Sequence, residues 1–335
     1  MRGKFYIISR GALPKHSAVD PVAALIHDID RTLDSGKVAT LVTMDIQGAF
    51  DSVLRKRLIF RLREQGWPIQ LVKWVDSFMS SRSARVRFKE TTTDDLPLHC
   101  GLPQGSPVSP ILFLLYTQPI YRLGEQQQQR FGYADDVAML QIGDTIEETT
   151  GKATEDISSL VSWGQENAVH FDHEKTEVMH FSRQRARNFT PLHIQHEGVA
   201  KRPGKALRWL GIWFDQKLSF TTHVDKWAIK ANSLAFHLRS LANTQRGPLP
   251  SAMQRGVISC VIPTLLYGVE AWFPGLARPS ATTGMTVRTG VKHLIDRQTR
   301  PLLQEIMRTT TRPNSRTIAK RTISSHFACP HTHLI

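Results

Sequence analysis

The sequence predicts an α+β fold in which a β-sheet carries helices on one face. Residues 38–45 (VATLVTMD) form a β-branched apolar run, typical of a buried strand. Residues 130–140 (RFGYADDVAML) predict two short strands around a tight turn that contains two acids. Residues 145–167 have helical periodicity, and their apolar face consists of Ile146, Ala153, Ile157, Leu160 and Val161. Helices and strands therefore alternate along one chain, which favours an α+β arrangement.

The remaining elements follow from turn signals and apolar spacing. After the first strand, Asp51 or Ser52 is predicted to cap a helix that ends at Gly66 and Pro68. Its apolar positions are Val53, Leu54, Leu58, Ile59 and Leu62. The other expected elements are a helix at Ile69–Met79, a half-exposed strand at 84–89, a Gly- and Pro-rich turn at 101–110, a helix from Ile111 to about Tyr116, a strand at Glu177–Phe181 and a hairpin at Leu207–Phe214.

Composition excludes several classes of protein. The chain has 335 residues, of which 41% are hydrophobic and 21% are charged, so it is neither collagen-like nor wholly disordered. Its three cysteines share no CxxC spacing, which excludes a disulfide scaffold and favours a reducing compartment. The apolar run near the start covers only Phe5–Ile8, and the longest uncharged stretch, 256–269, contains Pro263. We therefore expect a soluble intracellular protein with no membrane partner.

The net charge is +14, and most of it lies in the last third of the chain. Residues 216–335 contain 16 basic and four acidic residues, which gives +12, whereas the first 215 residues are nearly neutral. A basic segment beside a neutral body favours a body that performs chemistry and a segment that binds a polyanion. For the residues after Ser280, a merely solvated tail remains an equal alternative.

Three acids are candidates for chemistry. Asp45 ends the first predicted strand, and Asp135 and Asp136 form the hairpin turn. Carboxylates at the ends of apolar strands are costly unless a cation pairs with them. If the two strands are neighbours, a divalent ion is the natural partner, and two Mg²⁺ ions would suit an in-line phosphoryl displacement. The alternative for the Asp-Asp pair is a simple turn, where Asp is a favoured residue.

Several sequence blocks, which include the three acids, occur in the same order as in a known protein family. The sequence resembles the palm of reverse transcriptases, above all those of non-LTR (LINE-like) retrotransposons of fungal type. The blocks that carry the resemblance are LVTMDIQGAFDSV (41–53), GLPQGSPVSPILF (101–113), FGYADDVAML (131–140), HFDHEKTEVMHF (170–181) and LRWLGIWFD (207–215), preceded by the fingers-like GALPKHSAVD (11–20).

The resemblance implies a polymerase palm with a four-stranded antiparallel sheet and helices on one face, partial fingers and a helical thumb-like C-terminal region. The implied boundaries are a fingers remnant at 1–37, a palm at 38–215 with a fingers insertion at about 54–100, a thumb-like region at 216–279 and a basic tail at 280–335. For the tail, order and disorder both stay open. The chain would be a fragment that lacks the endonuclease and much of the fingers.

The resemblance also implies an RNA-directed DNA polymerase that uses two Mg²⁺ ions, with Mn²⁺ as a substitute. Its partners would be an RNA template, a DNA primer or target DNA, and deoxynucleoside triphosphates, with action in the nucleus. Asp45 and Asp135 would ligate both metals, Asp136 would support them, and the carbonyl of Ile46 would be an extra ligand. Lys175 would assist the departure of pyrophosphate; a solvated loop lysine is the alternative.

Further roles follow from the same blocks. The implied nucleotide-binding residues are Phe50, Gln104, Gly105 and Lys15, and the implied primer grip consists of Trp209, Leu210 and Gly211. Phe50 would exclude the 2′-OH of ribonucleotides, and its alternative is a core aromatic residue. The alternative for the primer-grip residues is a simple buried hairpin. Asp51 is read as a helix cap without a catalytic role. Candidate phosphate binders near the start are Lys4, Arg10, Lys15 and His16, and candidate duplex contacts in the thumb are Lys226, Lys230 and Arg239.

Two other functions stay open as alternatives. The first is a truncated, inactive element remnant that only binds nucleic acid, because the fingers are incomplete. A viral RNA-directed RNA polymerase shares the paired acids, but Phe50 and the Leu-Pro-Gln-Gly block favour deoxynucleotides. The spacing of His326, Cys329, His331 and His333 fits no zinc finger or knuckle, so we expect no zinc site there. Separately, we expect no RNase H activity. The oligomeric state is left open.

Overall fold

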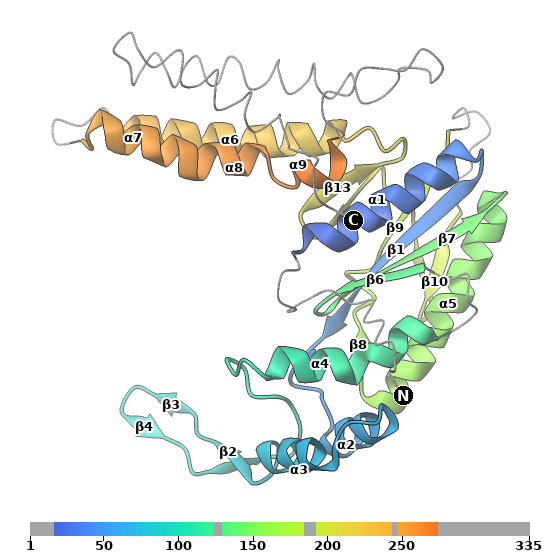
Figure 1. Ribbon diagram of the computed structural model, residues 1–335, viewed down its shortest axis with the longest axis vertical. Coiled ribbons are helices and arrows are strands. Elements are labelled where there is room, and N and C mark those ends of the chain that lie inside the picture. Colours follow the sequence, from blue (N-terminus) through green and yellow to red (C-terminus); the bar gives the residue numbers. More distant parts are fainter. Residues whose placement is uncertain (1–16, 124–128, 184–191, 243–246, 274–335) are drawn as a thin grey trace. The chain divides into compact units, whose positions relative to one another are not determined.

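The computed structural model describes residues 17–123, 129–183, 192–242 and 247–273 (Figure 1). The chain divides into two compact units, Met1–Lys205 and Ala206–Ile335. The predicted primer-grip hairpin belongs to the second unit, whereas the three candidate acids belong to the first.

An antiparallel sheet forms the centre of the first unit. Its strands are β1 (Val38–Gln47), β6 (Gln129–Tyr133), β7 (Asp136–Gly143), β8 (His170–Phe171) and β9 (Glu177–Phe181). The order is β6–β7–β1, and on its other side β1 pairs with β9 along its first half and with β8 at its end. Leu41 of β1 lies opposite Leu140 and Met179. The predicted α+β fold with an antiparallel sheet is confirmed, but within the described residues the sheet has five strands rather than the expected four, because both β8 and β9 pair with β1.

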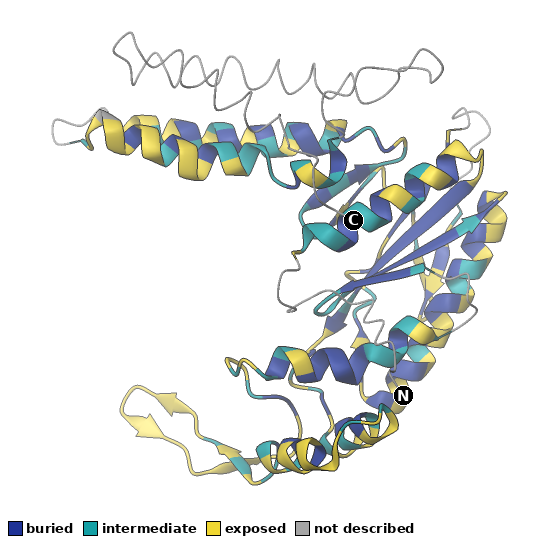
Figure 2. Ribbon diagram, viewed as in Figure 1, coloured by how far each residue is buried: buried dark blue, intermediate teal, exposed yellow. Residues whose placement is uncertain are grey.

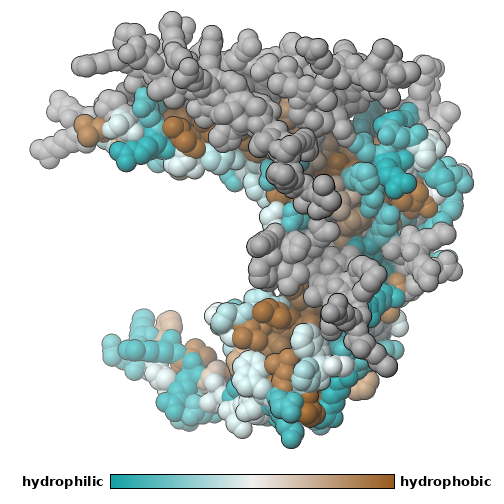
Figure 3. Space-filling view, viewed as in Figure 1, coloured by the Kyte–Doolittle hydropathy of each residue, from teal (hydrophilic) through white to brown (hydrophobic). Residues whose placement is uncertain are grey.

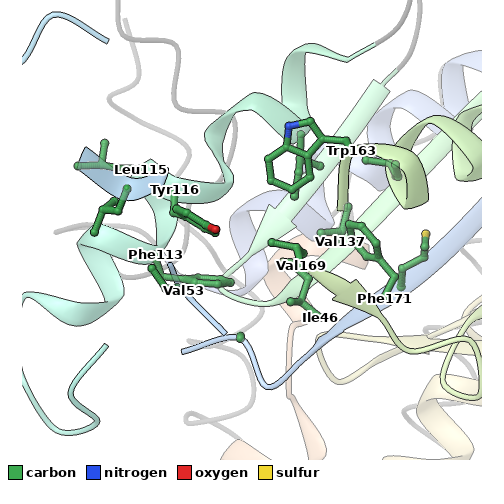
Figure 4. Close-up of a cluster of buried hydrophobic side chains, with 14 of the residues drawn as sticks. Ile46, Val53, Phe113, Leu115, Tyr116, Val137, Trp163, Val169 and Phe171 are labelled. Carbon is green, nitrogen blue, oxygen red and sulfur yellow. The ribbon is translucent and has the colours of Figure 1, made fainter. Parts of the chain in front are cut away.

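The longest helix of this unit, α5 (Ile146–Asn167), covers β1 and β7. The side chain of Thr145 accepts a hydrogen bond from the backbone N–H of Glu148, and Ala168 ends the helix in the left-handed region. The apolar face of α5 meets Val137 and Phe171 of the sheet in one buried cluster, which also includes Trp163 and Val169 (Figure 4). This helix matches its predicted bounds.

Helices α2 (Arg55–Glu64), α3 (Ile69–Phe78) and α4 (Ser109–Thr117) extend the same cluster, and a 3₁₀ turn, Gln118–Arg122, follows α4. Their buried contributions include Leu58, Leu62, Val72, Val75, Phe113 and Tyr116. Figure 3 shows hydrophobic surface in this part of the molecule. The exposed apolar side chains of these helices include Phe60, Ile69, Leu71, Trp74 and Ile111.

Helix α1 (Val19–Asp34) contacts β1 and β6, and it buries an apolar stripe that consists of Val22, Leu25, Ile26, Ile29 and Leu33. A small hairpin of β10 (Ile194–His196) and β11 (Val199–Lys201) contacts α5 through β10. Ile194 joins the main buried cluster.

Two local predictions are wrong. Neither Asp51 nor Ser52 caps α2: the residue before the helix is Leu54, and it makes no side-chain cap. The expected strand at 84–89 is broken into β2 (Arg82–Ala84), which pairs with β5 (Leu96–Leu98), and β3 (Arg87–Phe88), which pairs with β4 (Thr91–Thr92). These strands are mostly exposed (Figure 2). In the part of the chain that the structure describes, their alternating side chains therefore do not form a buried face.

A buried ion pair ties the β6–β7 hairpin to α5. The guanidinium of Arg130 pairs with Asp156, and both side chains are almost fully buried. Arg130 also donates to the backbone carbonyls of Ile120 and Leu123, and Gln141 donates to Asp156 at 2.9 Å. Because both charges have several partners, this burial is tolerable.

The second unit begins with a hairpin of β12 (Ala206–Trp209) and β13 (Ile212–Asp215), as predicted. Helix α6 (Thr221–Ala242) then packs on a helical stretch, which consists of α7 (Pro250–Gly256), a π-helical turn at Val257–Val261, α8 (Ile262–Leu265) and α9 (Val269–Trp272). Ala231 and Ala235 of α6 contact Val257 and Val261. The helical C-terminal region is confirmed as far as Phe273.

One helical stretch in the described part of the chain, Ser251–Trp272, is long and apolar enough to span a membrane by length and composition alone. Core helices of soluble proteins pass the same criterion, so it is weak evidence. This stretch packs on α6 through Val257 and Val261.

Candidate active site

The three candidate acids lie together at adjoining ends of β1 and the β6–β7 hairpin. Asp45 is the direct cross-strand partner of Asp136, and directly opposed residues of an antiparallel pair share a face. Asp135 lies in the two-residue loop before β7, and its carbonyl accepts a hydrogen bond from the backbone N–H of Ile46 at 3.2 Å. The structure therefore brings together Asp45, Ile46, Asp135 and Asp136, although β1 and β7 are far apart in sequence.

The electrostatics of this cluster oppose full ionisation. The pKa of Asp136 is raised to about 6, first by burial and then by the negative charges of Asp135 and Asp45. Lys175 acts in the opposite direction on the same carboxyl. A site that concentrates negative charge in this way favours a bound cation.

Lys175 supplies a cation to the cluster. Its Nζ lies 2.6 Å from Oδ2 of Asp45 and 3.8 Å from Oδ2 of Asp172. The hydrogen bond to Asp45 is the main reason that the pKa of Lys175 is raised. The lysine that the sequence singled out is therefore bound to the first candidate acid, while 62% of its side chain stays exposed.

The turn that carries Lys175 is fastened to β1. The backbone N–H of Asp172 donates to the carbonyl of Asp45 at 2.9 Å, and Oδ1 of Asp172 accepts from the N–H of Glu174 at 2.9 Å. The hydroxyl of Thr176 donates to the carbonyl of Asp172 at 2.9 Å and lies 2.9 Å from Nδ1 of His196. Since the single hydroxyl proton goes to the carbonyl, His196 must donate from Nδ1.

The sequence around Asp135 suits a tight hairpin. Ala134 has a φ of 55°, in the left-handed region that costs a non-glycine residue about 1–2 kcal/mol. Gly132 allows a close approach, because a Cβ there would clash with the hydroxyl end of the Tyr121 side chain, which would have to shift. The small residues of FGYADD thus permit the turn that presents the two acids.

The predicted nucleotide-binding residues lie on two loops that bond to each other. Leu102 donates from its backbone N–H to the carbonyl of Phe50 at 2.7 Å. The side chain of Gln104 donates to Oδ1 of Asp51 at 3.1 Å, which is the contact that Asp51 makes in place of capping α2. Phe50 is half-buried, and its ring centroid lies 5.4 Å from that of Phe113.

Gly105 and Lys15 complete that predicted set. Gly105 has a φ of 88° and is exposed, with open space where a Cβ would be. Lys15 lies outside the described residues, as do Lys4, Arg10, His16 and the segment 280–335.

The predicted primer-grip residues form the turn of the β12–β13 hairpin in the second unit. Trp209 is buried, and Leu210 and Gly211 make the two-residue loop. The carbonyl of Leu210 accepts a hydrogen bond from the hydroxyl of Tyr267 at 3.0 Å, and that of Gly211 accepts from Nε1 of Trp227 at 3.1 Å.

Sequence reasoning missed the residues that support these sites. Asp172 and Thr176 lie in the same block as Lys175, and an Asp followed by turn residues is a signal for such a loop. His196, Trp227 and Tyr267 gave no comparable signal, because each acts on residues that are distant in sequence.

The donor set suits Mg²⁺, which prefers carboxylate oxygens. Within the described ranges, no group of three or more His, Cys, Asp or Glu side chains is arranged to hold a metal ion. The carboxylate of Asp45 instead binds the ammonium of Lys175.

Comparison with known proteins gives a consistent result. The family model for reverse transcriptase (RNA-dependent DNA polymerase) matches residues 9–214. The chain is 26% identical over 273 residues to a probable RNA-directed DNA polymerase from transposon BS of Drosophila melanogaster, covering 79% of this chain and 30% of that protein. It is 25% identical over 216 residues to the RNA-directed DNA polymerase from mobile element jockey of the same species, covering 63% and 23%.

The chain thus spans less than a third of the length of these relatives. A solved structure of apo telomerase from Candida Tropicalis aligns with 98% of this chain and 56% of its own, at a TM-score of 0.45 and 13% identity.

Proposed function

Because the chain belongs to the reverse transcriptase (RNA-dependent DNA polymerase) family and is of the LINE-like kind, we propose that it carries the polymerase centre of a non-LTR retrotransposon. It would extend the 3′-OH of a DNA primer or target DNA with deoxynucleotides that an RNA template selects, in the nucleus. The fungal subtype and the domain boundaries stay predictions.

The observation that carries this proposal is the position of Asp136 opposite Asp45, with Asp135 in the adjoining loop. These three carboxylates, with the carbonyl of Ile46, would hold two Mg²⁺ ions, or Mn²⁺ in their place. Bound there, the ions would stabilise the attacking and leaving oxygens of an in-line displacement. Burial is the first cause of the raised pKa of Asp136, and repulsion from Asp135 and Asp45 adds to it; a bound cation would relieve that repulsion, which supports the proposal.

The chain's own residues would do the remaining work. Lys175 carries a proton at Nζ beside the acids, so it would neutralise charge on the departing pyrophosphate. Phe50 would lie against the sugar and exclude a 2′-OH by its bulk. Gln104 and Gly105 would contact the nucleotide and template from the loop that is bonded to Phe50.

Primer extension on poly-rA with oligo-dT tests the catalytic assignment. Asp45→Asn, Asp135→Asn and Asp136→Asn are each expected to lower dTTP incorporation about 1,000-fold, because several kcal/mol of charge stabilisation are lost. Asp144→Asn is the matched control: this acid follows β7 at its opposite end and is 78% exposed. Incorporation that survives equally in all four variants would identify a contaminant and refute the proposal.

The same assay with ribonucleotides tests Phe50. Phe50→Ala is expected to raise the ratio of UTP to dTTP incorporation at least about tenfold, because the bulk that excludes the 2′-OH is gone. Phe60→Ala, which removes an exposed ring from α2, is the control. An unchanged ratio would leave Phe50 as a core residue only.

A second candidate function is that of an inactive remnant that binds nucleic acid without polymerising. The observation that favours it is the Lys175–Asp45 ion pair, because its ammonium binds a carboxylate that the proposed metal ions would need. Salt-dependent binding of an RNA–DNA duplex without incorporation, in either Mg²⁺ or Mn²⁺, would establish this alternative.

A further inference from the structure

The turn between β12 and β13 has a backbone that its own sequence does not favour. Leu210 has a φ of 45° and Gly211 a φ of 82°. Hairpin loops with positive φ at both positions prefer Asn-Gly or Asp-Gly, because an L side chain in the left-handed region costs about 1–2 kcal/mol. Leu210 has no polar side chain to offset this cost, so contacts from elsewhere must hold the turn.

Two aromatic side chains from other elements make those contacts. The hydroxyl of Tyr267 donates to the carbonyl of Leu210 at 3.0 Å, and Nε1 of Trp227 donates to the carbonyl of Gly211 at 3.1 Å. The two rings stack on each other, with centroids 4.8 Å apart and planes inclined by 30°. A Cβ on Gly211 would lie 2.6 Å from the ring of Tyr267, so the ring is in close contact with the turn.

His223 fixes the two aromatic residues relative to the hairpin. Its Nδ1 accepts from the backbone N–H of Trp213 at 3.2 Å, and its Nε2 donates to the carbonyl of Tyr267 at 3.1 Å. The side chain is almost fully buried. One imidazole therefore connects β13, α6 and the loop that carries Tyr267.

Two lysines lie on the same assembly. Nζ of Lys230 is 4.6 Å from the ring centroid of Trp227, and Nζ of Lys226 is 5.4 Å from that of Trp213. Both lysines are exposed. Cations held over indole rings beside a constrained turn suit contact with the phosphates of a nucleic acid.

We propose that Trp227 and Tyr267 are positioning residues that clamp the Leu210–Gly211 turn in the geometry needed to hold a primer end, with Lys226 and Lys230 bound to the adjacent phosphates. The proposal deepens the proposed function and rests on it for the identity of the bound strand. The clamp itself rests only on contacts within the second unit.

Removal of single polar groups tests the clamp. Trp227→Phe removes the N–H donor to Gly211, and Tyr267→Phe removes the hydroxyl donor to Leu210, while each keeps an aromatic ring. Trp272→Phe is the matched control, because its Nε1 also donates to a backbone carbonyl in this cluster, that of Tyr267 at 3.3 Å, but not to the turn. Thermal unfolding of all three variants reports any general loss of stability.

The expected result is a rise of about three- to tenfold in the KM for primer–template in Trp227→Phe and in Tyr267→Phe, with the KM for dTTP unchanged. Hydrogen exchange of the amides of residues 210–212 is expected to accelerate by a similar factor. Trp272→Phe should stay within about twofold of the unchanged protein in both measurements. Equal effects in all three variants, or unchanged exchange at the turn, would overturn the clamp.

The two proposals fail differently. If the unchanged chain does not extend primers, the proposed function fails, and the affinity for an RNA–DNA duplex replaces KM as the readout of the clamp. If extension occurs but Trp227→Phe behaves like Trp272→Phe, the clamp fails and the proposed function stands.

Discussion

The buried imidazole of His223 is expected to make the stability of the second unit depend on pH. Burial is the main cause that lowers its pKa from 6.5 to about 4, and the hydrogen bond to the carbonyl of Tyr267 acts in the opposite direction. The neutral ring satisfies both of its neighbours, because Nδ1 accepts and Nε2 donates. A second proton would place two N–H donors, those of His223 and Trp213, against each other.

The sign of the effect follows from proton uptake on unfolding. Because the folded pKa lies below the unfolded one, the stabilisation is present above pH 6.5 and is lost as the pH falls toward 4. The full difference corresponds to about 3 kcal/mol, and the part lost between pH 7 and pH 5 is about 2 kcal/mol.

Urea unfolding at pH 7 and at pH 5, followed by tryptophan fluorescence, measures this loss. His223→Gln keeps an acceptor and a donor but does not titrate, so its free energy of unfolding should fall by about 2 kcal/mol less than that of the unchanged protein over this pH interval. His237→Gln, at an exposed position of the same helix, should retain the full pH dependence. Identical losses in His223→Gln and the unchanged protein would refute the reasoning.

Three further predictions concern the first unit. Gly132→Ala should lower the free energy of unfolding by about 1–3 kcal/mol in urea, because its Cβ would clash with a tyrosine hydroxyl, whereas Gly151→Ala, with open space in α5, should raise it by about 1 kcal/mol. Asp156→Asn should cost about 3–5 kcal/mol by the same measurement, since it removes the negative charge that compensates the buried guanidinium of Arg130. Thr176→Val should lower kcat of primer extension about tenfold with little change in KM, and Thr176→Ser should restore it, because the hydroxyl fastens the turn that carries the candidate lysine.

Periodicity predicted the elements whose burial follows a simple pattern. The first strand, the acidic hairpin and the long helix at Ile146–Asn167 all appear close to their expected bounds, since their apolar spacing reflects one buried face. Residues 84–89 alternate in the same way, yet they form two short exposed pieces. An alternating pattern shows which side chains share a face, but it does not show that another element covers that face.

In the candidate site, too, local sequence predicted some features, whereas contacts between distant segments were not predictable. The position of Asp45 beside Asp136 was predictable because both lie at the ends of apolar strands that a sheet can pair. Asp51 was misread as a cap because its true partner, Gln104, is remote in sequence. The contacts of His196 with Thr176 and of Tyr267 with Leu210 also join distant segments, so no local spacing indicates them.

Because of the aromatic contacts on Leu210 and Gly211, we expect that the β12–β13 hairpin cannot be transplanted by itself. The ten residues of β12, the loop and β13 do not contain the groups that fix their own bend. A chimera that exchanges only this hairpin would lose the loop geometry, whereas one that also carries the α6 and Tyr267 segments would preserve it. A transplant that preserves the loop geometry therefore needs more of the chain than the hairpin motif itself.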